Sequence, residues 1–295
     1  MRVTVLHNPS AGGEELDRER LLELVEKAGY RADYHSTKHN GWKKALDDPR
    51  DLVIVAGGDG TVAKVARRLA GRGVPLAIIP LGTANNIAAS LGIGGSPESI
   101  ISGWETTQAV PTDLALATGP WGEKFIVEAV GLGVLPRLFH ESRSRVPKST
   151  TPVAEQIPRN VELLLEILHR TKSLRLGIEL DGRDLSGEYL MVEAMNIRAI
   201  GPRLDLAPDA DPGDGMLDVV LVREGDRAVL AQFLRRRLGD GEDDTQLTCV
   251  RGKHLRIRSE VGVVHLDDRT WRDPDKGPAM TIDVQMLGGA LSVLR

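Results

Sequence analysis

Two loops in the first third of the chain carry residue types that could bind a phosphate group. Each follows a short apolar run, 52–56 or 76–79, of the kind that forms a buried parallel strand. The first loop is Gly57-Gly58-Asp59-Gly60-Thr61, and the second is Pro80-Leu81-Gly82-Thr83-Ala84-Asn85-Asn86. Glycine allows a ligand to approach the backbone closely, and the helix expected after the first loop would offer unpaired N–H groups to an anion.

A carboxylate inside such a loop predicts a metal ion. Asp59 would repel a bound phosphate, so we expect a Mg²⁺ ion between the two, bound directly or through water. Thr83 would add a hydroxyl beside the first loop if the two strands are neighbours.

The two loops lie about one βαβ unit apart and together resemble those of the diacylglycerol kinase catalytic family. This family includes bacterial lipid kinases and sphingosine kinases and is more distantly related to NAD kinases. Gly-Gly-Asp-Gly alone would be a weak signal, because ordinary turns and NAD kinases also contain it. The Pro-Leu-Gly-Thr-Ala-Asn-Asn segment favours the lipid kinases. The resemblance implies ATP as co-substrate, Mg²⁺ and a role in phospholipid metabolism.

The resemblance also covers the turn after the first expected strand, Arg2–His7. In the family an Asn-Pro-x-x-Gly turn contacts the nucleotide, and the matching residues here are Asn8, Pro9, Ser10, Ala11 and Gly12. An ordinary strand-to-helix turn remains an alternative, whereas a Rossmann site is disfavoured because Gly-x-Gly-x-x-Gly is missing. Thr37, at the end of the expected strand 31–37, matches another nucleotide contact of the family.

The length of 295 residues and the changing pattern along the chain predict two domains. Residues 1–115 are expected to form an α/β domain of Rossmann-like, NAD-kinase-like type with a mostly parallel sheet. Residues 116–295 contain many short strands separated by Gly and Asp turns, which predicts a β-sandwich-like domain with inserted helices at 153–169 and 226–238. Its strands are expected at 125–130, Leu174–Leu180, 188–196, 216–222, 254–257, Val263–Leu266, 280–286 and 291–294.

Composition excludes several classes of protein. The net charge of -4 and pI near 6.0 argue against nucleic acid as a partner. A single cysteine, Cys249, excludes an internal disulfide, and its neighbours Leu247 and Val250 predict an inert position in a buried strand. The chain shows no signal-peptide pattern and no apolar stretch long enough to span a bilayer, so we expect a cytoplasmic protein that contacts the inner face of the membrane peripherally.

The segment Leu266-Asp267-Asp268-Arg269 stands where the resembled family has Asp-Gly-Glu. The resemblance therefore assigns Asp267 the role of general base near the reacting hydroxyl. Arg269 reverses the charge of the family's Glu, and this departure bears most directly on activity. Two further departures, Lys64 and Asn86, replace acidic residues near the expected Mg²⁺, although Lys64 could also lie on a solvated helix face.

A third segment, 208–218, contains closely spaced oxygen ligands of the kind that suit Mg²⁺ or Ca²⁺. By resemblance, the carboxylate of Asp214 and the backbone carbonyls of Asp211 and Met216 would hold a structural Mg²⁺. The alternative is a simple Asp-Gly turn between strands. The seven histidines, by contrast, show no metal-ligand spacing.

Basic and apolar side chains alternate after the Gly131-Leu132-Gly133 turn. Such a cluster could lie on an anionic membrane surface, although solvated helix ends explain it equally well. This cluster consists of Arg137, His140, Arg143, Arg145 and Lys148 with Leu138, Phe139 and Val146.

The run 235–237 of three arginines is expected on the polar face of a helix. The sequence leaves open whether the protein forms a homodimer.

The predicted reaction is transfer of the γ-phosphoryl group of ATP to the hydroxyl of a diacylglycerol-like lipid bound between the two domains. Two alternatives remain. One is NAD kinase, which has a similar glycine loop but a soluble acceptor. The other is a nucleotide-regulated, non-catalytic protein that binds a lipid or a partner, which the departures at Lys64, Asn86 and Arg269 would suit.

Overall fold

The computed structural model of the chain describes residues 1–11, 16–147, 151–239, 246–260, 263–272 and 279–295. The chain forms two compact units. The N-terminal unit comprises Met1–Leu114 and Gly288–Arg295, and the C-terminal unit comprises Ala115–Leu287. The sequence predicted a boundary at 115/116 and placed the last residues in the second domain, whereas Gly288–Arg295 joins the first.

The N-terminal unit is built on a parallel sheet with the strand order β2-β1-β3-β4, and the end of β18 pairs in parallel with β4. The predicted α/β domain with a mostly parallel sheet is confirmed. Its elements are β1 (Arg2–His7), α1 (Arg18–Lys27), β2 (Arg31–Ser36), the 3-10 helix η1 (Trp42–Leu46), β3 (Leu52–Gly57), α2 (Asp59–Leu69), β4 (Pro75–Pro80), α3 (Asn86–Ser90) and α4 (Pro97–Gly103).

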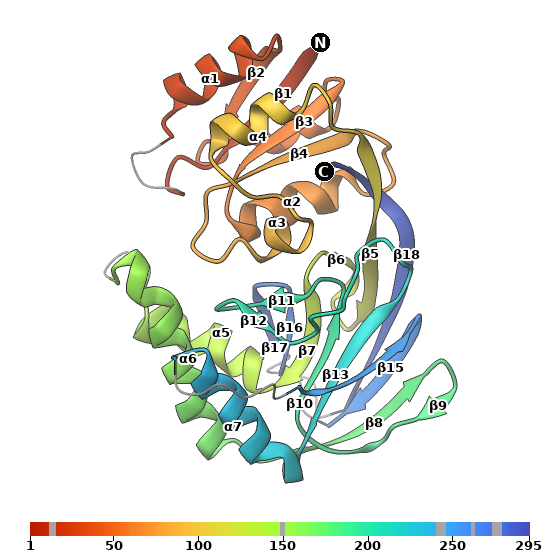
Figure 1. Ribbon diagram of the computed structural model, residues 1–295. Coiled ribbons are helices and arrows are strands. Elements are labelled where there is room, and N and C mark those ends of the chain that lie inside the picture. Colours follow the sequence, from red (N-terminus) through yellow and green to blue (C-terminus); the bar gives the residue numbers. More distant parts are fainter. Residues whose placement is uncertain (12–15, 148–150, 240–245, 261–262, 273–278) are drawn as a thin grey trace. The chain divides into compact units, whose positions relative to one another are not determined.

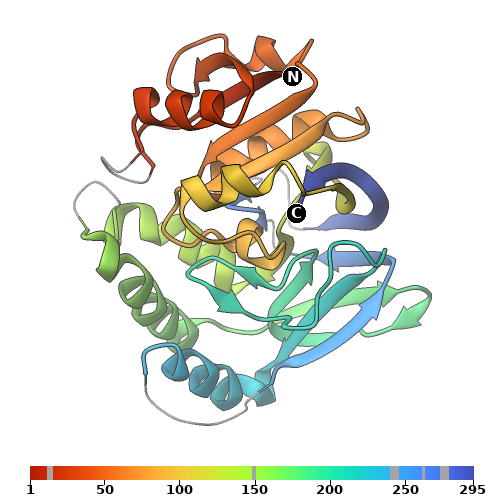
Figure 2. The same cartoon turned by 45° about the horizontal axis from the view of Figure 1, so that its top comes forward.

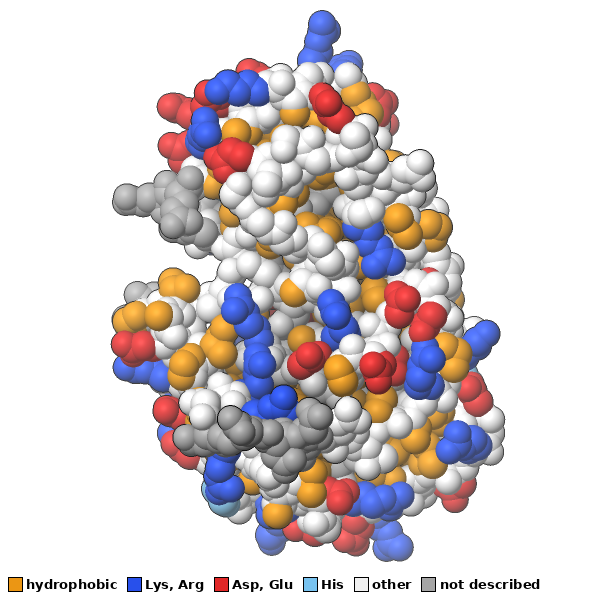
Figure 3. All heavy atoms as spheres, in the orientation of Figure 1, with side chains coloured by type: hydrophobic (Ala, Val, Ile, Leu, Met, Phe, Trp, Pro, Cys, Tyr) orange, Lys and Arg blue, Asp and Glu red, His pale blue; other side chains and the backbone are white. Residues whose placement is uncertain are grey.

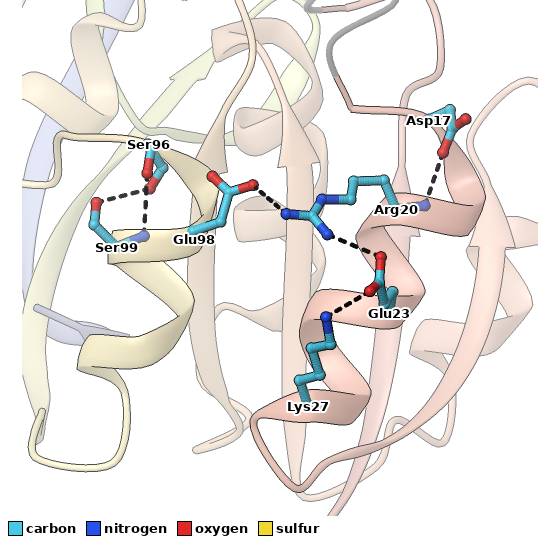
Figure 4. A network of polar contacts seen from close by, with 7 residues as sticks. All are labelled: Asp17, Arg20, Glu23, Lys27, Ser96, Glu98 and Ser99. Atoms are coloured by element: carbon cyan, nitrogen blue, oxygen red, sulfur yellow. Dashed lines mark hydrogen bonds and ion pairs between the residues drawn. The ribbon is translucent and has the colours of Figure 1, made fainter.

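Helices cover both faces of this sheet (Figure 1). Leu21 of α1 and Ile101 of α4 pack in one buried cluster with Val5 and Ile54 of the strands, and α2 lies against the opposite face. A polar network joins the two helices on the first face, because the Arg20 guanidinium of α1 reaches Glu98 of α4 at 3.0 Å (Figure 4). Both side chains are about half exposed, so this ion pair adds little to stability and the buried cluster holds the two helices on the sheet.

The C-terminal unit is antiparallel, with the strand order β17-β16-β7-β10-β8-β15-β18, and β13 pairs with β10 and β14. The predicted β-rich domain with inserted helices is confirmed. Its elements are β5 (Ala109–Gly119), β6 (Gly122–Ile126), β7 (Ala129–Gly133), α5 (Val134–Arg145), α6 (Val153–Arg170), β8 (Leu174–Leu180), β9 (Arg183–Asp184), β10 (Gly187–Met195), β11 (Ala199–Ile200), β12 (Leu204–Asp205), β13 (Leu217–Arg223), η2 (Glu224–Asp226), α7 (Arg227–Arg236), β14 (Thr248–Gly252), β15 (His254–Ser259), β16 (Val263–Leu266), β17 (Arg269–Arg272) and β18 (Met280–Leu294).

Helices α5, α6 and α7 pack side by side in both ribbon views (Figures 1 and 2). Leu138, Leu164 and Leu234, one from each helix, share a buried cluster with Met191 of β10 and Val220 of β13. The three helices therefore share one hydrophobic core with the sheet of their own unit.

Two predicted strand boundaries are wrong. Residues 125–130 form two strands, β6 and β7, because the N–H groups between them bond to a carboxylate instead of a neighbouring strand. Residues 280–286 and 291–294 belong to one strand, β18, in which Gly289 adopts φ 63° and donates its N–H to Asp113 Oδ1 at 2.7 Å. Glycine adopts this conformation readily, so the strand continues through the position at which the sequence analysis had divided it.

Among the described residues, no helix is long and apolar enough to cross a membrane. On the face drawn in Figure 3, basic and acidic side chains of the described residues are interspersed. This distribution agrees with the small net charge of -4.

Candidate functional site

The two glycine loops lie side by side at the carboxyl ends of β3 and β4, which pair in parallel with Gly57 opposite Pro80. A Cβ atom on Gly58 would lie 2.9 Å from Gly82 Cα, and one on Gly82 would lie 2.6 Å from Gly58 Cα. Leu81 N also donates to Gly57 O at 3.0 Å. The backbones of the two loops are therefore in direct contact, which only glycine permits at both positions.

Helix α2 begins inside the first loop. Gly58 is its N-cap residue, and no side chain caps the helix. Asp59 Oδ1 accepts a hydrogen bond from Ile87 N at 3.0 Å, so this carboxylate joins the first loop to the start of α3. A helix start that no side chain caps is suited to an anion, because its first N–H groups and the helix dipole face the same way.

The second loop is closed by a side chain of its own. Asn85, in the left-handed conformation at φ 54°, accepts from Gly82 N at 2.7 Å and donates to Gly82 O at 2.8 Å. Thr83 lies within this closed turn. Asn86, one of the departures from the resembled family, is buried, whereas Lys64 on α2 is exposed, as expected for a solvated helix face.

The turn after β1 joins the same cluster. Asn8 N donates to Ala56 O at 2.9 Å, and Asn8 Nδ2 lies 3.3 Å from Thr61 Oγ1 at the start of α2. Ser10 and Ala11 close the turn through their N–H groups onto Asn8 Oδ1 and Asn8 O. The structure thus brings together the loops around residues 8, 58 and 82, and the predicted Gly12 falls outside the described residues.

A cavity of about 590 Å³ opens beside this cluster. The guanidinium of Arg18 lies 4.8 Å from the ring centre of Tyr34 in its wall. The predicted Thr37 lies just after β2, where its N–H donates to His7 O at 2.8 Å. Sequence analysis missed the aromatic wall because its residues come from separate segments. The lining residues are Pro9, Arg18, Tyr34, His35, Ser36, His39, Asn40, Gly41 and Trp42.

Asp267, in the C-terminal unit, is fully buried in the turn between β16 and β17, with φ 52°. Its Oδ1 accepts hydrogen bonds from Val127 N at 3.1 Å, Glu128 N at 2.8 Å and Ala129 N at 3.3 Å. Its own N–H donates to Ala129 O at 2.8 Å. Asp267 therefore organises the segment between β6 and β7, a role that its position in the sequence did not reveal.

A buried acid–base pair lies next to Asp267. His265 Nε2 is 2.6 Å from Glu193 Oε2, and both side chains are 0% exposed. Burial raises the pKa of the Glu193 carboxyl, and the imidazole opposes that rise. Burial would lower the pKa of His265, but the carboxyl of Glu193 and the carbonyl of Asp267 outweigh it, so this pKa is raised. Sequence analysis missed the pair, because 72 residues separate its members.

The residues that follow Asp267 lie at the surface. Asp268 and Arg269 are both exposed, so the charge reversal at Arg269 affects the outer side of the turn.

The predicted structural cation site is arranged differently. Asp214 Oδ1 accepts from Met216 N at 3.0 Å, and Asp214 Oδ2 pairs with the Arg251 guanidinium. Arg251 Nε also lies 3.4 Å from Asp218 Oδ1, and Asp211 O accepts from Asp214 N at 3.3 Å. These residues do not fit a bound Mg²⁺ in this arrangement, since Arg251 takes the place beside Asp214 that the prediction gave to the metal. Among the described residues no group of three or more His, Cys, Asp or Glu side chains could hold a metal ion.

Two other expectations need correction. Cys249 as a residue is exposed in β14 and not buried, and its neighbours Thr248 and Arg251 are exposed as well. Its sulfur nevertheless lies 3.8 Å from Asp218 Oδ1, and partial burial of the thiol together with this carboxylate raises the pKa of Cys249 to about 12, which keeps the thiol protonated. In the basic cluster, Leu138 and Val146 are buried in the helical core and do not reach a membrane, and Lys148 falls outside the described residues.

Comparison with known families matches both parts of the chain. Residues 2–117 match the model of the diacylglycerol kinase catalytic domain, and residues 153–295 match that of the YegS C-terminal NAD kinase beta sandwich-like domain. A diacylglycerol kinase of Bacillus subtilis (strain 168) is 29% identical over 266 residues, which are 86% of this chain and 80% of that protein. A diacylglycerol kinase of Staphylococcus aureus (strain MRSA252) is 28% identical over 246 residues, which are 79% and 74% of the two chains.

Solved structures share the fold. The crystal structure of a diacylglycerol kinase from Bacillus anthracis str. Sterne superposes with a TM-score of 0.70 and 20% identity, covering 99% of this chain and 96% of that one. Yeast NADH kinase complexed with NADH superposes with a TM-score of 0.54 and 12% identity, covering 99% and 82%. The chain therefore has the two-domain fold found in both of these kinases.

The contact between the glycine loops can be tested with Gly82→Ala. The new Cβ atom would lie 2.6 Å from Gly58 Cα and 2.8 Å from Asn85 Oδ1, so the loops must separate. We expect destabilisation by about 1–3 kcal/mol and ATP binding weakened by at least about tenfold, a change of roughly 1.4 kcal/mol. Calorimetric titration with ATP and MgCl₂ and thermal unfolding measure the two effects. Gly94→Ala is the control, since a Cβ there meets nothing within 4 Å; equal ATP affinity of both variants would contradict a binding role for these loops.

The ion pair between Arg251 and Asp214 leads to a second prediction, on how the Tm depends on Mg²⁺. The Tm of the wild-type protein should be the same in EDTA and in MgCl₂, because a guanidinium already pairs with both Asp214 and Asp218. In Arg251→Ala, the two freed carboxylates should bind Mg²⁺ and make the Tm depend on it. Arg258→Ala, at an exposed position on β15, is the control. A lower wild-type Tm in EDTA would instead support the structural Mg²⁺ predicted from the sequence.

Proposed function

We propose that the chain, whose residues 2–117 match the diacylglycerol kinase catalytic domain and whose curated relatives include diacylglycerol kinases, is an ATP-dependent lipid kinase. In this proposal the γ-phosphoryl group of ATP is transferred to the hydroxyl of a diacylglycerol-like lipid. The observation that carries the proposal is the backbone contact between Gly58 and Gly82 beside the start of α2, where no side chain caps the helix. Phosphoryl transfer depends mainly on alignment and charge neutralisation, which such main-chain sites supply.

The triphosphate is proposed to lie against the N–H groups of the first loop, Gly57, Gly58, Asp59, Gly60 and Thr61, with help from the hydroxyl of Thr83. Mg²⁺, when bound, would offset the charge that develops on the transferred group, and Asp59 is its proposed ligand. Asp59 bonds to Ile87 N through Oδ1, which places its carboxylate between the first loop and the start of α3, and it would hold the ion directly or through water.

The adenine base is proposed to enter the cavity of about 590 Å³ beside the Asn8 turn. Tyr34 and Trp42 in its wall offer aromatic surface to a planar base. Arg18, which stacks on Tyr34, adds a positive charge close to the expected phosphates. This assignment is consistent with a nucleotide role for Asn8, Pro9, Ser10, Ala11 and Thr37.

Asp267 remains the proposed general base for the acceptor hydroxyl. Oδ1 accepts three backbone hydrogen bonds, from Val127, Glu128 and Ala129, and Oδ2 lies 3.3 Å from Val127 N. The acceptor hydroxyl is proposed to approach this carboxylate. Because the side chain is 0% exposed, the acceptor must displace part of the surrounding turn. Asp268 and Arg269, exposed on that turn, would then flank the acceptor.

The competing non-catalytic hypothesis draws support from Arg269 and Asn86, which remove negative charges that the family places near the reaction. In that case the protein would bind ATP and respond to it without transferring phosphate. NAD kinase activity is the weaker alternative, because the likeness to yeast NADH kinase concerns the fold alone. Peripheral contact with a membrane is proposed on the ground that the acceptor is a lipid.

Purified protein with labelled ATP, MgCl₂ and a panel of lipids in mixed micelles, beside NAD⁺, tests the proposed function. We expect the label in an organic-extractable lipid that carries a free hydroxyl, and no label with Gly82→Ala. Label in NADP⁺ would instead support the NAD kinase hypothesis. Binding of ATP without transfer to any acceptor would contradict the kinase proposal and favour the non-catalytic one.

The role of Asp267 is tested by Asp267→Asn. We expect turnover to fall by about 10²–10⁴-fold, with ATP affinity nearly unchanged, because the nucleotide loops belong to the other unit. The amide oxygen would keep the three N–H donors and the NH₂ group would take the Oδ2 position beside Val127 N, which should lower stability by roughly 1–3 kcal/mol, so turnover is measured well below the Tm. Asp184→Asn, at an exposed position on β9 of the same unit, is the control. Unchanged turnover in Asp267→Asn would exclude Asp267 as the base.

A further inference from the structure

We infer that Glu193 and His265 form a buried hydrogen-bonded pair that positions Asp267 for the transfer reaction. The inference rests on the proposed function, since it assigns the pair a role in the reaction for which Asp267 is the proposed base. Neither side chain is exposed, so neither touches a substrate directly. Both are positioning residues that act through the β16–β17 turn.

The hydrogen bonds of His265 define where its protons lie. Nδ1 is 2.9 Å from the backbone carbonyl oxygen of Asp267. A carbonyl oxygen only accepts, so Nδ1 carries a hydrogen and donates it. Nε2 and Glu193 Oε2, 2.6 Å apart, then share one further proton. Whether that proton sits on the carboxyl or on the imidazole, the pair has no net charge, which makes its complete burial tolerable.

The imidazole thereby holds one side of Asp267. His265 fixes the carbonyl oxygen of Asp267, and Ala129 O accepts the N–H of Asp267 at 2.8 Å. The turn needs this support, because Asp267 adopts φ 52°, a conformation that non-glycine residues seldom occupy without help. With its backbone held on both sides, the carboxylate can point at the N–H groups of 127–129.

The surroundings of the pair leave it little freedom. Gly131 lies opposite Glu193 in the paired strands β7 and β10, and a Cβ atom on Gly131 would collide with the Glu193 carboxyl. The Phe139 ring and the imidazole pack in a T-shaped arrangement with the ring centres 5.0 Å apart. Glu193 Oε1 has no hydrogen-bond partner among the described residues, so the bond to His265 is the contact that orients the carboxyl.

Stability alone does not account for a buried pair of this kind, because a protein with well-packed apolar residues in the same space is often as stable or more stable. It does provide a directed hydrogen bond to one backbone atom of the turn, which apolar residues cannot supply. The geometry therefore points to a positional role for the pair, through the exact placing of the Asp267 turn.

The test compares three variants in the lipid kinase assay. Glu193→Gln can still donate to Nε2 and leaves the pair neutral, so kcat should stay within about threefold of wild type. Glu193→Leu removes the hydrogen bond, and kcat should fall on the order of 10²-fold while KM for ATP stays within about twofold. Glu188→Leu, at an exposed position on the same strand, is the control. Wild-type kcat in Glu193→Leu, or an equal loss in Glu193→Gln and Glu193→Leu, would overturn the inference.

A second measurement does not depend on activity or on the folding of Glu193→Leu. In protein labelled with ¹⁵N-histidine, His265 should show a slowly exchanging Nδ1–H in the wild type and in Glu193→Gln. An unprotonated Nδ1 in the wild type would overturn the inference even if the kinase is active. If the wild type transfers no phosphate to any lipid while Nδ1–H is present, the proposed function fails and the described geometry of the turn stands.

Discussion

The candidate site depends on the close contact of two backbones, Gly58 against Gly82, at the ends of neighbouring parallel strands. Parallel strands place their carboxyl ends at one edge of the sheet, which is where ligands collect in open α/β folds. The contact leaves no room for a side chain at either position, so main-chain groups dominate this edge. Side chains then tie the loops together: Asn8 reaches Thr61, Asn85 closes the second loop on Gly82, and Asp59 joins the first loop to α3.

In the C-terminal unit a carboxylate binds the backbone N–H groups of a segment outside the sheet. In the N-terminal unit, by contrast, glycines allow two loop backbones to touch. Between β6 and β7 the chain leaves the sheet ladder, and buried N–H groups there would be costly without an acceptor. Asp267 supplies that acceptor from 140 residues away and thereby joins two distant segments. The Glu193–His265 pair in turn supports the Asp267 turn. A residue first considered for chemistry therefore also explains the local fold.

The sequence predicted those features whose cause is local. Apolar runs of a few residues predicted β1, β3 and β4, and the glycine loops that follow them could be recognised by composition alone. Features that depend on distant partners could not be found in this way. Glu193 and His265 are separated by 72 residues and Arg251 and Asp214 by 37, and neither pair follows a spacing rule. The aromatic wall of Tyr34 and Trp42 was missed although the two residues are close in sequence, because they follow no recognised motif. The exposure of Cys249 depends on the surroundings of β14.

The departures from the resembled family divide according to burial. Lys64 and Arg269 are exposed, so their charges are partly screened and affect mainly what approaches from outside. Asn86 is buried near the loops, where a neutral amide repels a triphosphate less than a carboxylate would. The groups that hold the framework, Asp59 and Asp267, accept backbone hydrogen bonds from Ile87 and Glu128. These bonds do not involve positions 64, 86 or 269, so the proposed phosphate site is compatible with the departures at those positions. For this reason the non-catalytic hypothesis requires more than the charge reversal at Arg269.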